Sequence, residues 1–337
     1  MKEAMFYKKM KNAVQCELCP RRCKLINGAT GFCHARKNIG GKLYSIMFGK
    51  PCSMAVDPIE KKPLFHFAPG SQCLSVATVG CNLDCKFCQN WQISKAKAAS
   101  GQDVPPEKLI SSNSSPGFAW TYTEPTILYE YFYETARLCE KLNKDFYHVW
   151  VSNGYTNPEP IKKAAKFLHA VNVDYKGDAE FYRKLCSAKL EHVQDSLLAH
   201  KKAGIWIEVT NLIIPGWNDS PTQIKEMCEW ISENIGQVPL HFSRYFPMHE
   251  LREPATPLKA LEQAAEIADK FFDFVYIGNV SSSREHTYCP NCKKLLIKRT
   301  GFSISEFNAK KKGKEYACPE CSRKIPLAGM KWSGFEK

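Results

Sequence analysis

The sequence contains no run of eighteen apolar residues, and its lysine-bearing start has neither the apolar stretch nor the cleavage site of a secretory signal. We therefore expect a cytoplasmic protein without a membrane span. Aromatic and basic residues are not interleaved in clusters of the kind that stack bases, which disfavours nucleic acid as a partner. Acidic residues are scarcer than basic ones, 34 against 47, and the resulting formal charge of +13 allows an acidic partner.

No repeat of solenoid length is present, and the composition, with 44% hydrophobic and 24% charged residues, is that of a globular protein. A chain of 337 residues favours one large domain with small satellites. Composition and glycine or proline punctuation divide it into three regions. We expect a cysteine-rich N-terminal segment with a candidate metal site over 1–72, a core over 73–280 and a basic, turn-rich module over 281–337.

The residue present in excess is cysteine, of which there are sixteen. In a reducing cytosol, clustered thiols indicate metal or redox chemistry more often than disulfides. Three groups stand out along the chain: Cys16, Cys19, Cys23 and Cys33; Cys81, Cys85 and Cys88; and Cys289, Cys292, Cys318 and Cys321. Five others are isolated, and we expect them to be small buried residues: Cys52, Cys73, Cys139, Cys186 and Cys228.

The core region alternates short apolar runs with helical stretches. Near-continuous apolar runs are typical of parallel strands covered on both faces, and they lie at 74–79, 117–122, 147–152, 170–175, 205–214 and 240–246, with a weaker run at 274–279. Helical segments are predicted between them at 125–143, 189–203, 221–235 and 257–273. Regular alternation implies right-handed βαβ units. The sequence therefore predicts an α/β fold, a partial (β/α)6-type TIM barrel.

Polar residues follow the ends of these runs. The carboxyl ends of barrel strands converge on one mouth, where active sites are built. The residues that we expect there are the triplet Cys81, Cys85 and Cys88, together with Glu124, Asn153, Gly154, Asp174, Lys176, Thr210 and His249.

The triplet Cys81-x3-Cys85-x2-Cys88 places three thiolates within eight residues. Three thiolates are too few to complete a tetrahedral zinc site or to bind all four irons of a cubane. A 4Fe–4S cluster held this way keeps one iron open for a small chelating ligand, and Phe87 would shield it from water. The alternatives are zinc completed by a distant histidine, and plain packing.

The segment GCNLDCKFCQNW resembles the C-x3-C-x-aromatic-C signature of the radical S-adenosylmethionine (radical SAM) superfamily. The resemblance implies that the amino and carboxylate groups of S-adenosylmethionine chelate the open iron. It also implies that one electron cleaves the sulfonium bond to leave a 5′-deoxyadenosyl radical.

Further segments resemble motifs of the same superfamily. TYTEPT makes Glu124 the candidate for the methionine amino group, although a glutamate before proline is also an ordinary helix start. SNGY resembles a turn where the backbone of Asn153 and Gly154 approaches the ligand. VDYKG resembles a motif of glycyl-radical-enzyme activases in which Asp174 and Lys176 lie near the methionine part; without that context, the pair is a surface ion pair.

Two later segments extend the likeness. NLIIPGWND resembles the fifth-strand segment of the activases, but Thr210 stands where they usually carry arginine, which removes one carboxylate contact. FPMHE places His249 near the adenosyl or methionine moiety, although a single histidine is often only structural.

The whole chain up to about residue 290 resembles the radical enzyme of the AmmeMemoRadiSam system, in the pyruvate formate-lyase activase-like branch. CELCPRRCKLINGATGFCHAR and GKPCSMAVDPIEKKPLFHFAPGS carry this resemblance. It implies dependence on S-adenosylmethionine and a 4Fe–4S cluster, a reductant protein such as flavodoxin or ferredoxin, and a functional link to Memo-type and AMMECR-type proteins.

The two outer cysteine groups can each saturate a metal. For Cys16, Cys19, Cys23 and Cys33 we expect zinc, with an auxiliary iron–sulfur cluster or free or redox-paired thiols as alternatives. Cys289-x2-Cys292 and Cys318-x2-Cys321 are two CPxC knuckles typical of a zinc ribbon, although the spacer is long. Here we expect structural zinc, with rubredoxin-like iron as the alternative.

The leading hypothesis is a radical SAM enzyme that abstracts hydrogen from an unidentified substrate, with no catalytic side chain beyond the cofactor ligands. One alternative is a glycyl-radical-enzyme activase, which is disfavoured because Thr210 stands where the activases usually carry arginine. The other is a zinc-containing RNA-binding or RNA-modifying protein, suggested by the charge and the zinc ribbon.

Overall fold

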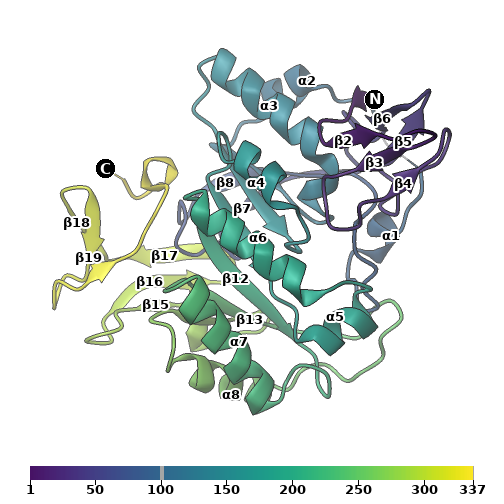
Figure 1. Cartoon of the computed structure of the whole chain (residues 1–337). Helices are drawn as coiled ribbons and strands as arrows, with labels where there is room; N and C mark the ends of the chain where they lie inside the picture. Colours follow the sequence, from purple (N-terminus) through teal and green to yellow (C-terminus); the bar gives the residue numbers. More distant parts are fainter. Residues whose placement is uncertain (99–101, 337) are drawn as a thin grey trace.

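The computed structural model describes residues 1–98 and 102–336, and its centre is an eight-stranded sheet (Figure 1). Seven strands are parallel and lie in sequence order: β8 (Gln72–Ala77), β9 (Gly117–Trp120), β10 (Tyr147–Ser152), β11 (Ala170–Asp174), β12 (Trp206–Ile213), β13 (Leu240–Arg244) and β14 (Val275–Gly278). An antiparallel strand, β7 (Ser53–Pro58), pairs with β8 at the edge. In the described chain no pairing joins β14 to β7, so the barrel is open and partial. The predicted fold class is confirmed.

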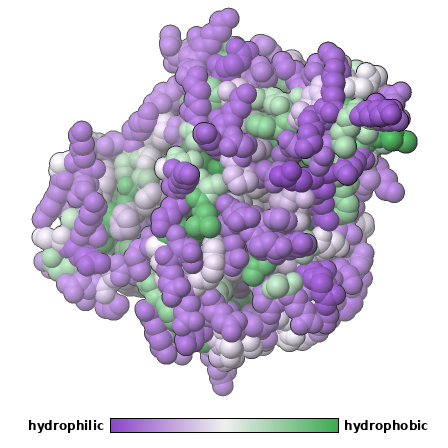
Figure 2. All heavy atoms as spheres, in the orientation of Figure 1, coloured by the Kyte–Doolittle hydropathy of each residue, from purple (hydrophilic) through white to green (hydrophobic). Residues whose placement is uncertain are grey.

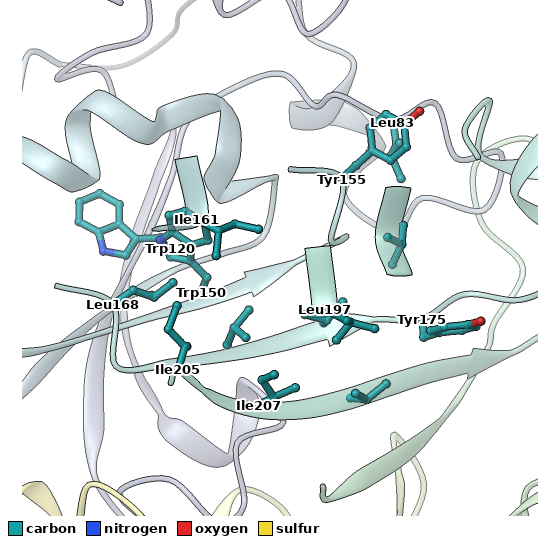
Figure 3. Packing of buried hydrophobic residues seen from close by; sticks show 14 of the residues in the cluster. Leu83, Trp120, Trp150, Tyr155, Ile161, Leu168, Tyr175, Leu197, Ile205 and Ile207 are labelled. Atoms are coloured by element: carbon teal, nitrogen blue, oxygen red, sulfur yellow. The ribbon is translucent and has the colours of Figure 1, made fainter. Parts of the chain in front are cut away.

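Strand β10 illustrates how the apolar runs build both faces of the sheet. Successive side chains point to opposite faces, so Tyr147 and Val149 enter the barrel interior while Trp150 packs outward against the helices. Trp150 meets Phe132 edge-on, with ring centroids 5.2 Å apart, and Figure 3 shows Trp150 with other buried side chains of this cluster. Burial on both faces explains why the run shows no alternation.

Each predicted helical segment contains one of the longer helices: α3 (Tyr129–Lys141), α6 (Leu190–Lys202), α7 (Pro221–Asn234) and α8 (Leu258–Ala268). The first turn of 125–143 is instead a 3-10 turn, η2 (Pro125–Leu128), because the Glu124 side chain caps it and Pro125 stands at its start. Four shorter helices complete the set: α1 (Trp91–Ser94), α2 (Pro106–Ser111), α4 (Pro158–Ala164) and α5 (Ala179–Leu185). Among the described residues, no helix has the length and apolar character needed to cross a bilayer.

The N-terminal segment forms two small antiparallel sheets near the carboxyl ends of the barrel strands (Figure 1). Their strands are β1 (Lys2–Glu3), β2 (Tyr7–Lys9), β3 (Val14–Cys16), β4 (Lys24–Leu25), β5 (Arg36–Ile39) and β6 (Lys42–Ser45). The segment is tied to the barrel by a buried ion pair, in which Arg36 donates to Glu130 of α3 at 2.6 Å. Residues 53–58, within the range expected to be the N-terminal segment, provide strand β7 of the main sheet.

The stretch after β7 fills the inside of the barrel. Its short turn is η1 (Ile59–Lys61), and the following residues run beneath the strands. Glu208 of β12 accepts hydrogen bonds from the backbone N–H groups of Phe65 and His66 and from the ring of His241, all at 2.8–2.9 Å. Residues 59–68 therefore fill the barrel interior below the strand ends, and we call this segment the barrel floor.

The C-terminal module packs against the opposite end of the barrel (Figure 1). It contains two three-stranded sheets, formed by β15 (Thr287–Tyr288), β16 (Leu295–Thr300) and β17 (Ser303–Phe307), and by β18 (Lys310–Lys312), β19 (Glu315–Ala317) and β20 (Lys324–Ile325). Buried Arg299 donates to the carbonyl oxygen of Phe65 at 2.8 Å, and a 3-10 turn, η4 (Met330–Trp332), brings Trp332 against Tyr147. On the face drawn in Figure 2, hydrophilic side chains cover most of the surface and hydrophobic ones lie in small groups.

A candidate cofactor site at the mouth of the barrel

A cavity of about 340 Å³ opens at the carboxyl ends of the parallel strands. The predicted residues that line it are Cys81, Cys85, Cys88, Glu124, Asn153, Asp174, Lys176 and Thr210. They come from the loop after β8, the loops after β9 and β10, the end of β11 and the middle of β12. The expected convergence of strand ends therefore assembles one polar site, as a parallel barrel requires.

The cysteine loop is held by hydrogen bonds to sulfur. The Sγ of Cys81 accepts from the backbone N–H of Leu83 at 3.4 Å and from the Asn153 side chain at 3.6 Å. Cys88 Sγ hydrogen-bonds with Ser94 Oγ at 3.2 Å. The three sulfur atoms do not all lie within 4.8 Å of one another, which is wider than a single ion needs.

Cys186, predicted to be a plain core residue, lies buried beside this loop. Its thiol, together with burial, raises the pKa of Cys85. The backbone of the same region holds the loop in place, since the N–H of Asp84 donates to the carbonyl oxygen of Cys186 at 3.1 Å. Cys186 does not line the cavity, so it packs behind the triplet and leaves the open side to other groups.

Glu124 is fully buried and its carboxylate already accepts four hydrogen bonds. Two come from the N–H and hydroxyl of Thr126, at 3.0 and 2.6 Å, and two come from Ser152 Oγ and the N–H of Asn153, both at 2.8 Å. Burial raises the pKa of Glu124, and this effect outweighs the four hydrogen bonds, which lower the pKa. The residue thus caps η2, as an ordinary helix start would, and also joins the loops after β9 and β10 at the cavity wall.

Asp174 and Lys176 form an ion pair on the cavity wall, with 2.7 Å between Nζ and Oδ2. Lys176 is nearly buried, and its ammonium lies 5.8 Å from the ring centroid of Phe87. Burial alone would lower the pKa of Lys176, but Asp174 and neighbouring groups raise it well above its ordinary value. The period of two along the strand end puts both side chains in the cavity, as expected.

Thr210 lines the cavity with a buried hydroxyl that has no hydrogen-bond partner among the described residues. A buried polar atom without a partner costs free energy, and such atoms are rare in folded proteins. Because Thr210 lies on the wall of the polar cleft at the strand ends, its hydroxyl is available to a ligand that enters the cavity.

Two predicted residues lie elsewhere. Gly154 is not part of the cavity lining; a Cβ there would lie 2.9 Å from both Val173 and Val193, so the glycine serves the packing of β11 and α6. Its φ of +73° adds a second reason for glycine. His249 also lies outside the cavity lining and stacks on Trp91 of α1, with ring centroids 5.3 Å apart.

Lys61, Lys62 and Tyr122 also line the cavity and were missed as site residues. Lys61 and Lys62 both donate to Asp57 at 2.8 Å, and the Tyr122 hydroxyl donates to the same carboxylate. Burial lowers the pKa of Lys62, whose side chain is only 1% exposed. The sequence signal was the paired lysines before Pro63, but nothing in a loop sequence shows that the loop enters a barrel.

The two outer cysteine groups differ in geometry. The four sulfur atoms of Cys289, Cys292, Cys318 and Cys321 all lie within 4.8 Å of one another, as the two-knuckle prediction requires. Within the described residues, no other set of three or more cysteine, histidine or carboxylate side chains meets that spacing. The N-terminal quartet instead surrounds a second, smaller cavity.

Comparisons with known proteins identify the family. The sequence model of the Radical SAM superfamily matches residues 75–231. Uncharacterized protein MJ0808 of Methanocaldococcus jannaschii is 43% identical over 337 residues, covering 97% of this chain and 99% of that protein; uncharacterized protein MJ0674 of the same organism is 24% identical, covering 58% and 62%. A crystal structure of a radical SAM methyltransferase from Sphaerobacter thermophilus shares the fold, with a TM-score of 0.51 at 12% identity, covering 63% of this chain and 68% of that chain. The chain belongs to the radical SAM superfamily.

Proposed function

We propose that this protein is a radical SAM enzyme that uses a 4Fe–4S cluster to cleave S-adenosylmethionine reductively and to abstract hydrogen from a substrate that is still to be identified. Superfamily membership implies S-adenosylmethionine and an iron–sulfur cluster. The observation that carries the proposal is the lining of one cavity by three thiols and by polar groups from several strand ends.

The residues of the cavity fit these cofactors. Cys81, Cys85 and Cys88 offer three thiolates at a spacing wider than a single ion needs, so they suit a polynuclear centre with one iron left for a ligand. When bound, the cluster and S-adenosylmethionine supply a 5′-deoxyadenosyl radical by one-electron reduction of the sulfonium bond.

The side chains have distinct tasks in this arrangement. The Asn153 amide donates to Cys81, and Glu124 fixes Asn153 through its backbone N–H. The free hydroxyl of Thr210 and the Asp174–Lys176 pair offer polar contacts to the amino acid part of the ligand. Phe87, which is buried on the cavity wall, excludes water from the reacting centre.

The test is anaerobic reconstitution with iron and sulfide, followed by dithionite and S-adenosylmethionine, with 5′-deoxyadenosine measured by chromatography. We expect the wild type to form 5′-deoxyadenosine and Cys85→Ser to form none. Cys228→Ser, a buried cysteine of α7 away from the cavity, is the matched control and should retain the activity. Absence of 5′-deoxyadenosine from fully reconstituted wild type would overturn the proposal.

The proposal extends to the AmmeMemoRadiSam system, with Memo-type and AMMECR-type proteins as partners and flavodoxin or ferredoxin as reductant. Its support is the likeness of two stretches, and both occupy structurally central places: one lines the N-terminal cavity and the other forms strand β7 and the barrel floor. Adding the two partner proteins should accelerate cleavage of S-adenosylmethionine with either protein reductant. If the cleavage rate is unchanged and the two proteins do not co-elute with this one, they are not its partners.

For the C-terminal quartet we propose structural zinc. A tetrahedral zinc with Zn–S bonds of about 2.3 Å sets its sulfur atoms about 3.8 Å apart. The pairs Cys289–Cys321 and Cys292–Cys318 already lie 3.5 Å apart. We expect Cys292→Ser to lose about one zinc per chain by elemental analysis, without loss of iron. Loss of iron instead of zinc would favour a rubredoxin-like centre.

A further inference from the structure

The four N-terminal cysteines enclose a cavity that the proposed function does not use. Cys16, Cys19 and Cys33 are each less than a tenth exposed, Cys23 is half-buried, and all four line the same space. The remaining wall is largely apolar, and includes Leu18, Leu25, Phe32 and Ile127. Four thiols that face one enclosed space are a donor set of the kind that soft metals and iron–sulfur clusters take.

The spacing of these thiols separates two kinds of metal centre. A single zinc ion draws its four sulfur atoms to about 3.8 Å from one another. The C-terminal quartet is the internal standard for that geometry, since its sulfur atoms all lie within 4.8 Å, whereas no three of the N-terminal sulfur atoms do. A cubane binds each thiolate to a different iron and so holds its ligands farther apart. In this respect the N-terminal quartet resembles the triplet of the main cavity, of which the three sulfur atoms also do not all lie within 4.8 Å, and differs from the knuckles.

The charges around the cavity favour an anionic occupant. Arg36 lines the cavity and is 1% exposed; one of its nitrogens binds Glu130, while its Nε and Nη1 have no partner among the described residues. Arg21 also lines the cavity, and its buried Nη2 is likewise without a partner in that part of the chain. Guanidinium N–H groups need acceptors, and the sulfides and thiolates of a cluster provide them.

The cavity shares a wall with the main site. A Cβ placed on Gly80 would lie 2.2 Å from the carbonyl oxygen of Cys33, so the backbone next to Cys81 rests directly on the N-terminal site. Asn82 lines the N-terminal cavity and accepts from Asn153 on the other side at 2.9 Å. The loop after β8 thus lies between the two thiol-lined cavities and contributes Cys81 to one and Asn82 to the other.

We propose that Cys16, Cys19, Cys23 and Cys33 hold a second 4Fe–4S cluster whose irons are all bound by cysteine, and that it stores and transfers single electrons next to the main site. With no open iron, this cluster has no position for a substrate or for S-adenosylmethionine. It takes one electron from a low-potential one-electron donor of the ferredoxin or flavodoxin class, which is oxidised by one electron. The cluster passes from the 2+ to the 1+ state, and it returns to 2+ when the main-site cluster of the proposed function accepts the electron; no proton or atom is transferred.

The metal content of the whole protein tests the proposal first. Anaerobically reconstituted wild type should hold about eight irons, about eight sulfides and about one zinc per chain, if two cubanes and one zinc ribbon are present. About four irons with two zincs would place zinc on the N-terminal quartet. About four irons with one zinc and four extra titratable thiols would leave that quartet free. Either result overturns the proposal.

A variant lacking the main cluster isolates the second one. In Cys81→Ser/Cys85→Ser/Cys88→Ser, about four irons should remain, with a reversible one-electron reduction and a paramagnetic resonance signal that does not change when S-adenosylmethionine is added. The matched control is Cys81→Ser/Cys85→Ser/Cys88→Ser with Cys139→Ser, an isolated buried cysteine of α3, which should keep the same iron. Iron-free protein that holds a second zinc, or iron that cannot be reduced, would contradict the proposal.

This readout stands apart from the proposed function. If the wild type cleaves no S-adenosylmethionine but the triple variant retains the reducible cluster, the enzyme assignment fails and the N-terminal centre remains. If wild type forms 5′-deoxyadenosine while the triple variant holds no iron, the enzyme assignment stands and the N-terminal cluster is ruled out. Should the triple variant not fold, the iron-to-zinc ratio of the wild type still decides between the outcomes.

Discussion

At the scale of single residues, the polar side chains of the main cavity are of two kinds. Glu124 accepts three hydrogen bonds at Oε1 and one at Oε2 from donors of the protein, whereas Thr210 presents a hydroxyl with no partner among the described residues. The first kind shapes the cavity and the second is left for what enters it. Substitutions should therefore separate an effect on stability from an effect on ligand binding.

Glu124→Gln tests the shaping role. The amide nitrogen cannot accept hydrogen bonds, so at least one of the four donors, the N–H of Asn153 at Oε2, loses its acceptor, at a cost of about 1–3 kcal/mol in the free energy of unfolding. We expect this loss in urea unfolding, together with a fall of tenfold or more in the rate of S-adenosylmethionine cleavage. Glu140→Gln, on the exposed side of α3, is the control and should change neither quantity. Unaltered stability would show that the network does not support the fold.

Thr210→Val tests the ligand-binding role. The substitution removes a buried hydroxyl that no described residue satisfies and keeps the shape, so the thermal midpoint should stay the same or rise. The KM for S-adenosylmethionine should rise about tenfold, the effect of one lost hydrogen bond of about 1.4 kcal/mol.

The matched control for Thr210→Val is Thr135→Val in α3. The hydroxyl of Thr135 is also buried and has no partner in the described part of the chain, but it lies away from the cavity. Its loss should leave the KM unchanged. An equal KM for both variants would mean that Thr210 does not contact the ligand.

Most residues expected after the strand ends line the cavity, including those in the loops after β8, β9 and β10, whereas the contribution of the loop after β7 was missed. Asp174, Lys176 and Thr210 follow from strand ends and the period of two, which fix the direction of a side chain. Lys61 and Lys62 could not be predicted, because the path of a loop depends on long-range contacts such as those from Glu208 to Phe65 and His66. The resemblance to known motifs pointed to His249 as a site residue, but it could not show that this side chain stacks on Trp91 outside the cavity lining.

At the scale of secondary structure elements, the apolar runs predicted every parallel strand because burial on both faces leaves a continuous pattern. The strands of the N-terminal segment are only two to four residues long and show no period that could be read from the sequence. Strand β7 was missed for another reason: its exposed positions are the apolar Met54 and Val56 while Asp57 is buried, which is the reverse of the pattern that predicts a strand.

Gly154→Ala is the test at this scale, since the glycine joins β10 to the turn before α4. The added methyl group would meet Val173 and Val193 at 2.9 Å in a backbone with φ of +73°. We expect a loss of about 2–4 kcal/mol in urea unfolding, from overpacking and left-handed strain together.

Gly204→Ala is the control for Gly154→Ala. Gly204 has φ of +71°, but no atom lies within 4 Å of the position that its added methyl group would take, so only the strain of about 1 kcal/mol should appear. Equal losses in the two variants would show that packing against β11 and α6 is not what requires glycine at residue 154.

At the scale of the whole molecule, one buried network joins the barrel floor, the barrel and the C-terminal module. The backbone N–H of His66 donates to Glu208 of the barrel, while its ring hydrogen-bonds with the carbonyl oxygen of Pro326 in the C-terminal module at 2.7 Å and with the hydroxyl of Tyr276. Arg299 adds a hydrogen bond from the module to Phe65. The C-terminal module is thereby coupled to the barrel floor through a histidine that is fully buried.

This network predicts acid sensitivity. Burial lowers the pKa of His66 to about 4, below its ordinary value near 6.5, so the folded state binds fewer protons than the unfolded state between these values. Stability should be complete above about pH 6.5 and should fall as the pH drops toward 4. Thermal midpoints measured across this window should decline less in His66→Gln than in wild type, because glutamine does not titrate.

His192→Gln, on the surface of α6, is the matched control and should reproduce the wild-type dependence on pH. Buried His148 and His200, whose pKa values burial also lowers, should keep part of the acid sensitivity in the His66 variant. A pH profile of His66→Gln that coincides with wild type would mean that this histidine does not limit acid stability.

The contact between Gly80 and Cys33 bears on where this enzyme could be shortened. The superfamily match begins at residue 75, which invites a cut at that boundary. A fragment trimmed there would lose strand β7, the lysines of the barrel floor and the carbonyl on which the loop before Cys81 rests. Its sheet would end in an unpaired edge strand, which is prone to pair with another chain and to aggregate. The contacts that support the barrel therefore extend at least to Cys33, well before the start of the superfamily match.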